Sequence, residues 1–370
     1  MKYILQIFSG FWSTLRYRAE DIISRIDSLA SGIEIDKVII GWSTDASLYR
    51  QLGSWLHGKG IQMLLWLPIF SEVRAELQPD PARDVFGKAV AAPSTQEGET
   101  FHFVCPSSGR NAEIVKETYE QFFSGCGFDG VFLDRIRSQS FEAGISGIFS
   151  CACERCRRAF QEKGVNTADI RKLYEAQKDA FFDVASWPMD GEFLLENPLA
   201  QRYFEVREEI VADAVSDIAG YFKSKGLLVG MDLFAPVVSR LVGQRYPLIT
   251  RYADFIKPML YRRTEAPAGI GYEYALLEKN APKARGKIRL AMDSAFLRTQ
   301  LEAIRNIPCA KYPGIEINHD EKLVRTDPGY IRESLSAIRE YGFEGATLCW
   351  DIMNVPEARY CSRDGRTKSK

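Results

Sequence analysis

The chain alternates from end to end between short apolar runs rich in β-branched residues and longer amphipathic stretches. This alternation is typical of βα units that build a parallel sheet. Several of the apolar runs follow a stretch that ends in glycine, the residue that best adopts the left-handed turn closing a helix. The alternation predicts eight strands: Tyr3–Phe8, Lys37–Trp42, Ile61–Leu67, Gly130–Asp134, Leu227–Phe234, Phe255–Tyr261, Gly314–Ile317 and Ala346–Asp351.

Eight parallel strands close most simply into an α/β fold of the (β/α)₈ barrel type, and 370 residues suit one barrel with insertions. An open doubly wound sheet is the alternative. No G-x-G-x-x-G follows the first strand, which disfavours a dinucleotide-binding version of that alternative. We therefore expect one catalytic barrel over residues 1–360 with long loops after strands three and four. A helical, cysteine-rich insertion is expected at about 135–226, and a polar tail at 361–370.

The charge balance argues against several classes of partner. The formal net charge is −1, so no overall field attracts nucleic acid or an anionic membrane. The sequence has no run approaching the roughly 20 apolar residues of a membrane helix, and its start is typical of a first strand rather than of a signal peptide. We expect a cytoplasmic protein whose eight cysteines are thiols or metal ligands rather than disulfides. Assembly into a homo-oligomer is left open.

Carboxylates lie at or near the ends of four of the last five predicted strands. They are Asp134, Asp232, Glu316 and Asp351. The carboxyl ends of barrel strands form one mouth, where active sites are built, so we expect these side chains to gather there. Taken alone, Asp351 is better explained as a strand terminus or a helix N-cap.

Glycoside hydrolysis needs one carboxylic acid and one carboxylate that attacks or activates water. Arg135 and Arg137 follow Asp134 closely and favour its ionised form, which suits a nucleophile or base. Asp232 lies in apolar company, where a raised pKa would suit the acid. Glu316 is a third catalytic candidate. The sequence does not fix the distance between the carboxyls, and retention of configuration is the working expectation.

Aromatic residues also lie at or near the strand ends, where sugar rings can stack on them, although core packing explains at least half of them equally well. Lys257 shares strand parity with Tyr261 and points either into the barrel or to its helix-facing side. The candidate substrate-binding residues are Trp42, Trp66, Arg137, Lys257, Tyr261, Trp350 and Asp351.

The segment GFDGVFLDRIRS around Asp134 resembles a family of glycosyl hydrolases with (β/α)₈ barrels. The segments VGMDLFAPVVSRLVGQRY, FIKPMLYR and GATLCWDI are similar to later parts of that family, so the resemblance covers strands four to eight. It implies a carbohydrate-active enzyme with Asp134 in the catalytic position. The amylase clan places its nucleophile at strand four and its acid at strand five, as with Asp134 and Asp232. Glu316 matches a strand-seven nucleophile of another clan, whose strand-four Asn-Glu is replaced here by Leu133–Asp134.

The segment SCACERCRRAF contains Cys151, Cys153 and Cys156 in a C-x-C-x-x-C spacing. Closely spaced thiolates suit tetrahedral zinc, which needs four ligands, and Cys105 is the candidate for the fourth. A barrel-type β-galactosidase family is similar in this loop. That resemblance implies a structural Zn²⁺ ion that clips two long loops together. Free thiols and an iron–sulfur or redox role are the alternatives, and no organic cofactor is expected.

Two other functions are consistent with the sequence. In a metal-dependent sugar isomerase or aldolase, Asp232, Glu316, His319 and Asp351 would hold a hard divalent ion. The chain has three histidines, which counts mildly against transition-metal catalysis. A carbohydrate-binding barrel without catalysis is the third hypothesis, since a fold does not fix a function. For the glycoside hydrolase, which is the favoured hypothesis, the expected substrate is a small glycoside or an oligosaccharide.

Overall fold

The computed structural model describes residues 1–90, 101–177, 182–288 and 290–355. Its main sheet is a closed barrel of eight parallel strands, because β1 pairs with β11 and β10 pairs with β8. The predicted (β/α)₈ barrel is confirmed. The barrel strands are β1 (Lys2–Phe8), β2 (Ile35–Gly41), β3 (Gln62–Pro68), β4 (Gly130–Asp134), β7 (Leu228–Phe234), β8 (Phe255–Met259), β10 (Gly314–Glu316) and β11 (Gly345–Cys349).

The predicted strands agree with the barrel strands to within two residues at either end. Three shorter strands were not predicted. Strand β9 (Ala310–Lys311) extends the sheet beside β8, and β5 (Val184–Ser186) pairs antiparallel with β6 (Leu194–Leu195). Strands of two or three residues are too short to show an alternating pattern in the sequence.

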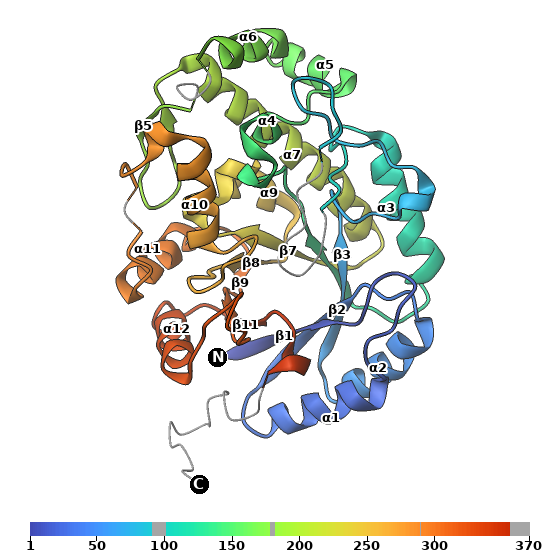
Figure 1. Cartoon of the computed structure of the whole chain (residues 1–370). Helices are drawn as coiled ribbons and strands as arrows, with labels where there is room; N and C mark the ends of the chain where they lie inside the picture. Colours follow the sequence, from blue (N-terminus) through green and yellow to red (C-terminus); the bar gives the residue numbers. More distant parts are fainter. Residues whose placement is uncertain (91–100, 178–181, 289, 356–370) are drawn as a thin grey trace.

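Helices surround the barrel (Figure 1). Their starts follow from the local sequence: Asp45 caps α2 by accepting the backbone N–H groups of Ser47 and Leu48, and Asn197 caps α7 ahead of Pro198. The helices between successive strands are α1 (Ala19–Ala30), α2 (Ala46–Gly58), α3 (Gly109–Phe122), α7 (Pro198–Ser224), α10 (Ile270–Asn280), α11 (Ser294–Ile304) and α12 (Pro328–Glu340). Shorter helices are α4 (Gly144–Ile148), α5 (Glu154–Glu162), α6 (Thr167–Gln177), α8 (Pro236–Ser239) and α9 (Tyr246–Ile249).

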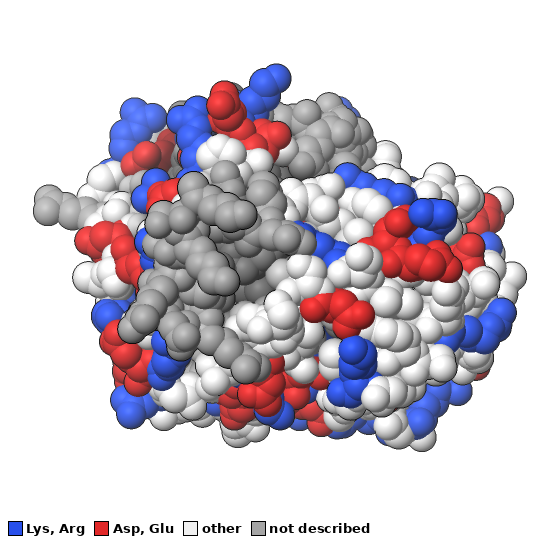
Figure 2. Space-filling model, turned by 90° about the horizontal axis from the view of Figure 1, so that it is seen from below, with Lys and Arg blue, Asp and Glu red and all other residues white. Residues whose placement is uncertain are grey.

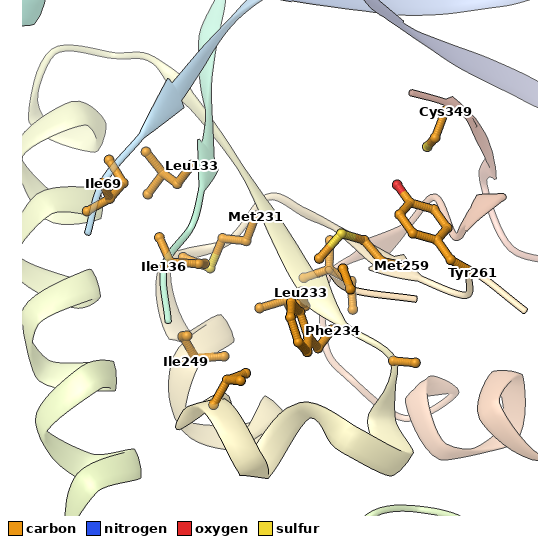
Figure 3. Packing of buried hydrophobic residues seen from close by; sticks show 14 of the residues in the cluster. Ile69, Leu133, Ile136, Met231, Leu233, Phe234, Ile249, Met259, Tyr261 and Cys349 are labelled. Atoms are coloured by element: carbon orange, nitrogen blue, oxygen red, sulfur yellow. The ribbon is translucent and has the colours of Figure 1, made fainter. Parts of the chain in front are cut away.

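Alternate strand residues face the helices or the barrel interior. The outward set joins the helices in the main core, as Leu133, Met231 and Leu233 do beside Ile249 (Figure 3). The inward set forms a separate apolar cluster, in which the ring of Phe132 stacks on that of Phe255 at 6.0 Å between centroids. This inner cluster consists of Ile4, Ile39, Leu64, Phe132, Phe255 and Tyr312. It fills the barrel below the polar residues at the carboxyl ends of the strands.

Two long connections leave the carboxyl ends of β3 and β4. The first connection runs from the end of β3 at Pro68 to the start of β4 at Gly130. The second begins where β4 ends, at Asp134, and reaches α7 at Pro198, which is 64 positions later. Residues 91–100 of the first connection and the predicted tail at 361–370, with Cys361, lie outside the described residues.

The surface carries charges of both signs. On the face shown in Figure 2, basic and acidic side chains are interspersed with uncharged ones in the part that is described. This matches the formal net charge of −1. Among the described residues, the helices include none that combines the length and the apolar character needed to cross a bilayer.

Candidate active site and four-cysteine cluster

Asp134 is the last residue of β4 and is 9% exposed. The indole Nε1–H of Trp66, from the neighbouring strand β3, donates to its Oδ2 at 2.8 Å. The backbone N–H of Arg135 donates to Oδ1 at 2.5 Å, and Arg135 adopts a left-handed φ of 53°. Each carboxylate oxygen of Asp134 is therefore held by an N–H donor at the mouth of the barrel.

Asp232 lies beside Asp134 across the β4–β7 pairing. Leu133 is the register partner of Met231, so the next residues of the two strands are neighbours on the inner face. Adjacent strands are about 4.8 Å apart. Lys257 Nζ donates to Asp232 Oδ2 at 2.9 Å and to the side chain of Gln6 at 3.0 Å, which places Lys257 inside the barrel. The sheet itself therefore brings the two aspartates together.

The environment of Asp232 disfavours its charged form. Burial raises the pKa of Asp232 to about 7, and the charge of Asp134 adds to this effect, while the ammonium of Lys257 opposes it. The side chain of Asp232 is 3% exposed and that of Lys257 is 1% exposed. Among the described residues, Oδ1 of Asp232 is buried and has no hydrogen-bond partner. One oxygen of this carboxyl is thus left without a donor, which suits a bound proton.

Arg137 is a buried cation next to this pair. Its Cζ lies 5.0 Å from the ring centroid of Phe103 and 4.8 Å from that of Phe234, and Nη1 donates to the Ser138 carbonyl at 3.1 Å. Burial lowers the pKa of Arg137, and the nearby carboxyl of Glu273 is the largest influence in the opposite direction. The structure therefore places this predicted substrate-binding residue at the mouth, between two aromatic rings.

Two carboxyls near Arg137, a partly buried one on Glu142 and a buried one on Glu273, were missed by the sequence reasoning. Glu142 accepts the hydroxyl of Tyr272 at 3.0 Å, and Glu273 accepts the backbone N–H of Ala268 at 3.1 Å. Burial raises the pKa of Glu273 to about 7 and also raises the pKa of Glu142. Glu142 lies in the short 3-10 helix Phe141–Ala143 and Glu273 in the first turn of α10. Glutamates in such positions resemble ordinary surface residues, and the sequence carries no signal that distinguishes them.

Trp42 and Trp66 belong to an aromatic cluster at the ends of the first three strands. Their rings meet edge to face at 5.7 Å, and Phe8 contacts Trp42 at 5.5 Å and Trp66 at 6.3 Å. Phe11, which the sequence reasoning did not select, packs on Trp42 at 6.1 Å and is 44% exposed. Trp42 is 3% exposed, so most of its surface is used in packing.

Tyr261 and Trp350 lie beyond the ends of β8 and β11. Their rings meet edge to face at 6.3 Å. Tyr261 is buried and its hydroxyl end points towards Cys349 (Figure 3). Burial raises the pKa of Tyr261 well above its usual value, with Cys349 and Asp232 adding to the effect. The two rings therefore form a second aromatic group near the mouth.

The remaining strand-end residues have contacts of their own. Glu316 accepts the backbone N–H of Arg263 at 2.6 Å, and burial raises its pKa to about 7. Asp351 caps the short helix Ile352–Asn354 by accepting the Met353 N–H at 3.1 Å. His319 Nδ1 lies 2.9 Å from the Thr326 carbonyl oxygen. The metal-dependent hypothesis requires these residues to converge with Asp232, but the one metal-ligand group among the described residues consists of cysteines.

The four predicted cysteines come together. Among the described residues, they form the one group of three or more His, Cys, Asp or Glu side chains placed to share a metal ion, with all Sγ atoms within 4.8 Å of one another. Cys105 Sγ is 3.4 Å from the Sγ atoms of both Cys153 and Cys156. Four sulfurs at about 2.3 Å from one zinc ion lie about 3.8 Å apart in a tetrahedron, so the thiols fit this ion.

The cluster joins the two long connections. Cys105 comes from the β3–α3 connection, Cys151 and Cys153 precede α5, and Cys156 lies in its first turn. The backbone N–H of Arg83 donates to Cys151 Sγ at 3.4 Å, an outer-shell contact of the kind that orients metal ligands.

Comparisons with known proteins identify the fold. A scan against family models and a search of curated proteins both find no match. Among solved structures, the glycoside hydrolase domain of PgaB (BpsB) from Bordetella bronchiseptica has a TM-score of 0.59 at 14% identity, covering 90% of this chain and 88% of that chain. Alpha-L-fucosidase isoenzyme 2 from Paenibacillus thiaminolyticus has a TM-score of 0.56 at 12% identity, with 97% of this chain matching 47% of that chain. The resemblance to barrel-type glycoside hydrolases is thus confirmed at the level of the fold.

Proposed function

We propose that the chain is a glycosidase that uses Asp134 and Asp232 as its catalytic pair. The observation that carries this proposal is the β4–β7 register, which sets the two carboxyls side by side at the mouth. Their surroundings differ: Asp134 accepts two N–H donors, whereas burial raises the pKa of Asp232 to about 7. Two carboxyls with different surroundings are what an acid and a nucleophile require.

The proposed reaction divides the work between these groups. Protonated Asp232, through the oxygen that Lys257 leaves free, gives its proton to the glycosidic oxygen as the bond to the leaving group breaks. Ionised Asp134 attacks the anomeric carbon, and water then releases the sugar with Asp232 acting as base. Neighbouring strands about 4.8 Å apart suit the separation of about 5–5.5 Å typical of retaining enzymes. Retention is therefore part of the proposal.

Substrate binding is assigned to the groups around this pair. Trp66 donates to Asp134 and packs against Trp42, and Arg137 lies three residues after Asp134 with Phe234 against its guanidinium. Tyr261 and Trp350 form the second aromatic group. Aromatic faces and fixed polar groups suit a carbohydrate, either a small glycoside or an oligosaccharide. Lys257 orients Asp232 in this scheme.

Glu316 and Asp351 rank lower as catalytic groups. Glu316 accepts the backbone N–H of Arg263. Asp351 caps the helix that follows β11, and its other oxygen accepts the Tyr17 hydroxyl at 3.1 Å. Glu316 remains the substitute for Asp232 as the acid, because burial raises the pKa of both to about 7.

A panel of chromogenic glycosides tests the function. The wild-type protein is expected to hydrolyse at least one of them, and Asp134→Asn is expected to lose activity by about 10³-fold while its Tm stays near the wild-type value. Asp129→Asn is the matched control, because Asp129 precedes the same strand at its opposite end and its amide can still accept the Met63 N–H. Full activity of Asp134→Asn would remove Asp134 from its role.

A non-catalytic carbohydrate-binding barrel is the second candidate, and the Asp232–Lys257 ion pair favours it. If Lys257 keeps Asp232 ionised, Asp232 carries no proton to give to the leaving group and cannot act as the general acid. A bound intact oligosaccharide, with no turnover over the whole panel, would select this function.

We also propose that Cys105, Cys151, Cys153 and Cys156 bind one structural Zn²⁺ ion. Bound zinc would supply a closed four-sulfur cross-link rather than a reaction centre. A reducing compartment such as the cytoplasm suits such thiolates. Elemental analysis of protein purified without chelators is expected to find one zinc per chain, lost in Cys153→Ser and kept in Cys309→Ser. Zinc-free wild-type protein would refute the assignment.

A further inference from the structure

The segment Phe101–Cys105 connects the cysteine cluster to the mouth of the barrel. Phe103 pairs antiparallel with Ser71, and the backbone N–H of Val104 donates to the Phe70 carbonyl at 2.9 Å. In an extended segment, residues two apart point to the same side. Phe101, Phe103 and Cys105 have this spacing and are 5%, 3% and 0% exposed. One face of the segment therefore carries two aromatic rings and a cluster thiol.

The ring of Phe103 covers one face of the Arg137 guanidinium. The distance from Arg137 Cζ to the ring centroid is 5.0 Å, and Phe234 covers the group from β7 at 4.8 Å. Arg137 is 5% exposed, and the ion pairs of the described residues do not include it. The two rings cover the faces of a buried guanidinium beside Asp134 and Asp232, and its Nη1 donates in addition to the Ser138 carbonyl at 3.1 Å.

The arrangement is repeated one step nearer to Asp134. The Cζ of Arg135 lies 4.3 Å from the ring centroid of Phe101 and 4.7 Å from that of Trp42. One ring again comes from the barrel and the other from the segment that ends in Cys105. The same segment thus contacts both arginines that follow the proposed nucleophile.

We propose that Phe103 is a positioning residue, anchored by the four-cysteine cluster, that sets the guanidinium of Arg137 for substrate binding. Cys105 is two residues from Phe103, and its Sγ lies 3.4 Å from those of Cys153 and Cys156. A bound ion would cross-link these four side chains, so its loss removes the cross-link, releases Cys105 and loosens Phe103. The kinetic part of this proposal rests on the proposed glycosidase function, whereas the structural coupling does not.

Three variants separate positioning from packing. Phe103→Leu removes the ring but keeps an apolar side chain, and Phe103→Tyr restores the ring. Phe160→Leu is the matched control, because Phe160 is equally buried on α5 near Cys156 but stacks on Tyr203 rather than on an arginine.

On the glycoside found by screening, Phe103→Leu is expected to raise KM about 3- to 30-fold with kcat within twofold. Phe103→Tyr and Phe160→Leu are expected to keep KM within twofold of wild type. A wild-type KM in Phe103→Leu would overturn the proposal.

A spectroscopic arm tests the coupling without any turnover. Trp42 stacks against Arg135, so loosening of Phe101–Cys105 alters its surroundings. Tryptophan emission of Cys105→Ser is expected to shift relative to wild type, whereas that of Cys309→Ser is not, and the shift is expected to disappear in a Trp42→Phe background. Zinc content is measured alongside, and Phe103→Leu is expected to keep its zinc. If Cys105→Ser loses its zinc but keeps the wild-type emission, the coupling is overturned. If its emission shifts clearly but the wild-type protein hydrolyses no glycoside, only the glycosidase function is refuted.

Discussion

The two ends of the barrel strands use aspartate in different ways. At the amino ends, Asp129 precedes β4 and Asp254 precedes β8. Each accepts a backbone N–H from a neighbouring strand at 2.7 Å, from Met63 and Val229 respectively. Both side chains are 31% exposed. These carboxylates complete the hydrogen bonding of the sheet and keep contact with water.

At the carboxyl ends, the aspartates are set against one another. Asp232 lies beside Asp134 with a side chain 3% exposed, and it accepts a hydrogen bond from a lysine that is also buried. Two neighbouring carboxyls taken out of water cost stability. In (β/α)₈ barrels, special residues at the amino ends serve stability and those at the carboxyl ends serve catalysis. The contrast in burial therefore supports the proposed site at the carboxyl ends, where burial of the two carboxyls costs stability.

The largest expected effect comes from breaking the buried pair. Lys257→Met leaves Asp232 without its partner, and we expect it to lower the free energy of unfolding by about 3–5 kcal/mol in urea denaturation. The matched change at the other end is Lys223→Met, which removes the partner of Asp254 in a pair whose side chains are 37% and 31% exposed. That change is expected to cost less than about 1 kcal/mol. Equal losses in the two variants would contradict the contrast between the two ends.

The next effect is a pH dependence of the stability that Glu316 contributes at the carboxyl end of β10. Burial raises the pKa of Glu316 to about 7, whereas an unfolded chain releases this proton near pH 4. The stability that Glu316 contributes is therefore complete below about pH 4 and is lost as the pH rises through 7, at up to about 1.4 kcal/mol per pH unit.

Glu316→Gln removes this titration without changing the shape of the side chain. The difference in Tm between Glu316→Gln and wild type is expected to shift in favour of the variant between pH 5 and pH 8, as followed by thermal unfolding. Glu302→Gln, at a side chain that is 56% exposed, is the control and should show a constant difference. A pH-independent difference for Glu316→Gln would show that its carboxyl stays ionised throughout.

The smallest expected effect lies at the amino end. Asp129→Ala removes the acceptor of the Met63 N–H and is expected to cost about 1–2 kcal/mol in the free energy of unfolding. Glycoside hydrolysis by the remaining folded protein should equal that of wild type, because Asp129 is at the far end of β4 from Asp134. A loss of kcat in Asp129→Ala would show that the two ends of this strand are coupled.

The sequence by itself determined the architecture. Each barrel strand is a local run of apolar residues, and the periodicity of such a run belongs to the chain itself. Asp134 could likewise be placed at a strand end, because it directly follows the apolar run of β4. The grouping of Cys105 with Cys151, Cys153 and Cys156 was also predictable, since the C-x-C-x-x-C spacing supplies three ligands and a tetrahedral site needs a fourth.

Only the tertiary structure decided how those residues are used. Lys257 reaches across 251 positions of the chain to Gln6, and Trp66 across 68 positions to Asp134. Such contacts depend on the register between strands and on barrel closure, which no local pattern encodes. The sequence therefore placed carboxylates at the strand ends and favoured a strand terminus or helix cap for Asp351, which does cap a helix. The fold alone set Glu316 against the backbone of Arg263 and Asp134 beside Asp232.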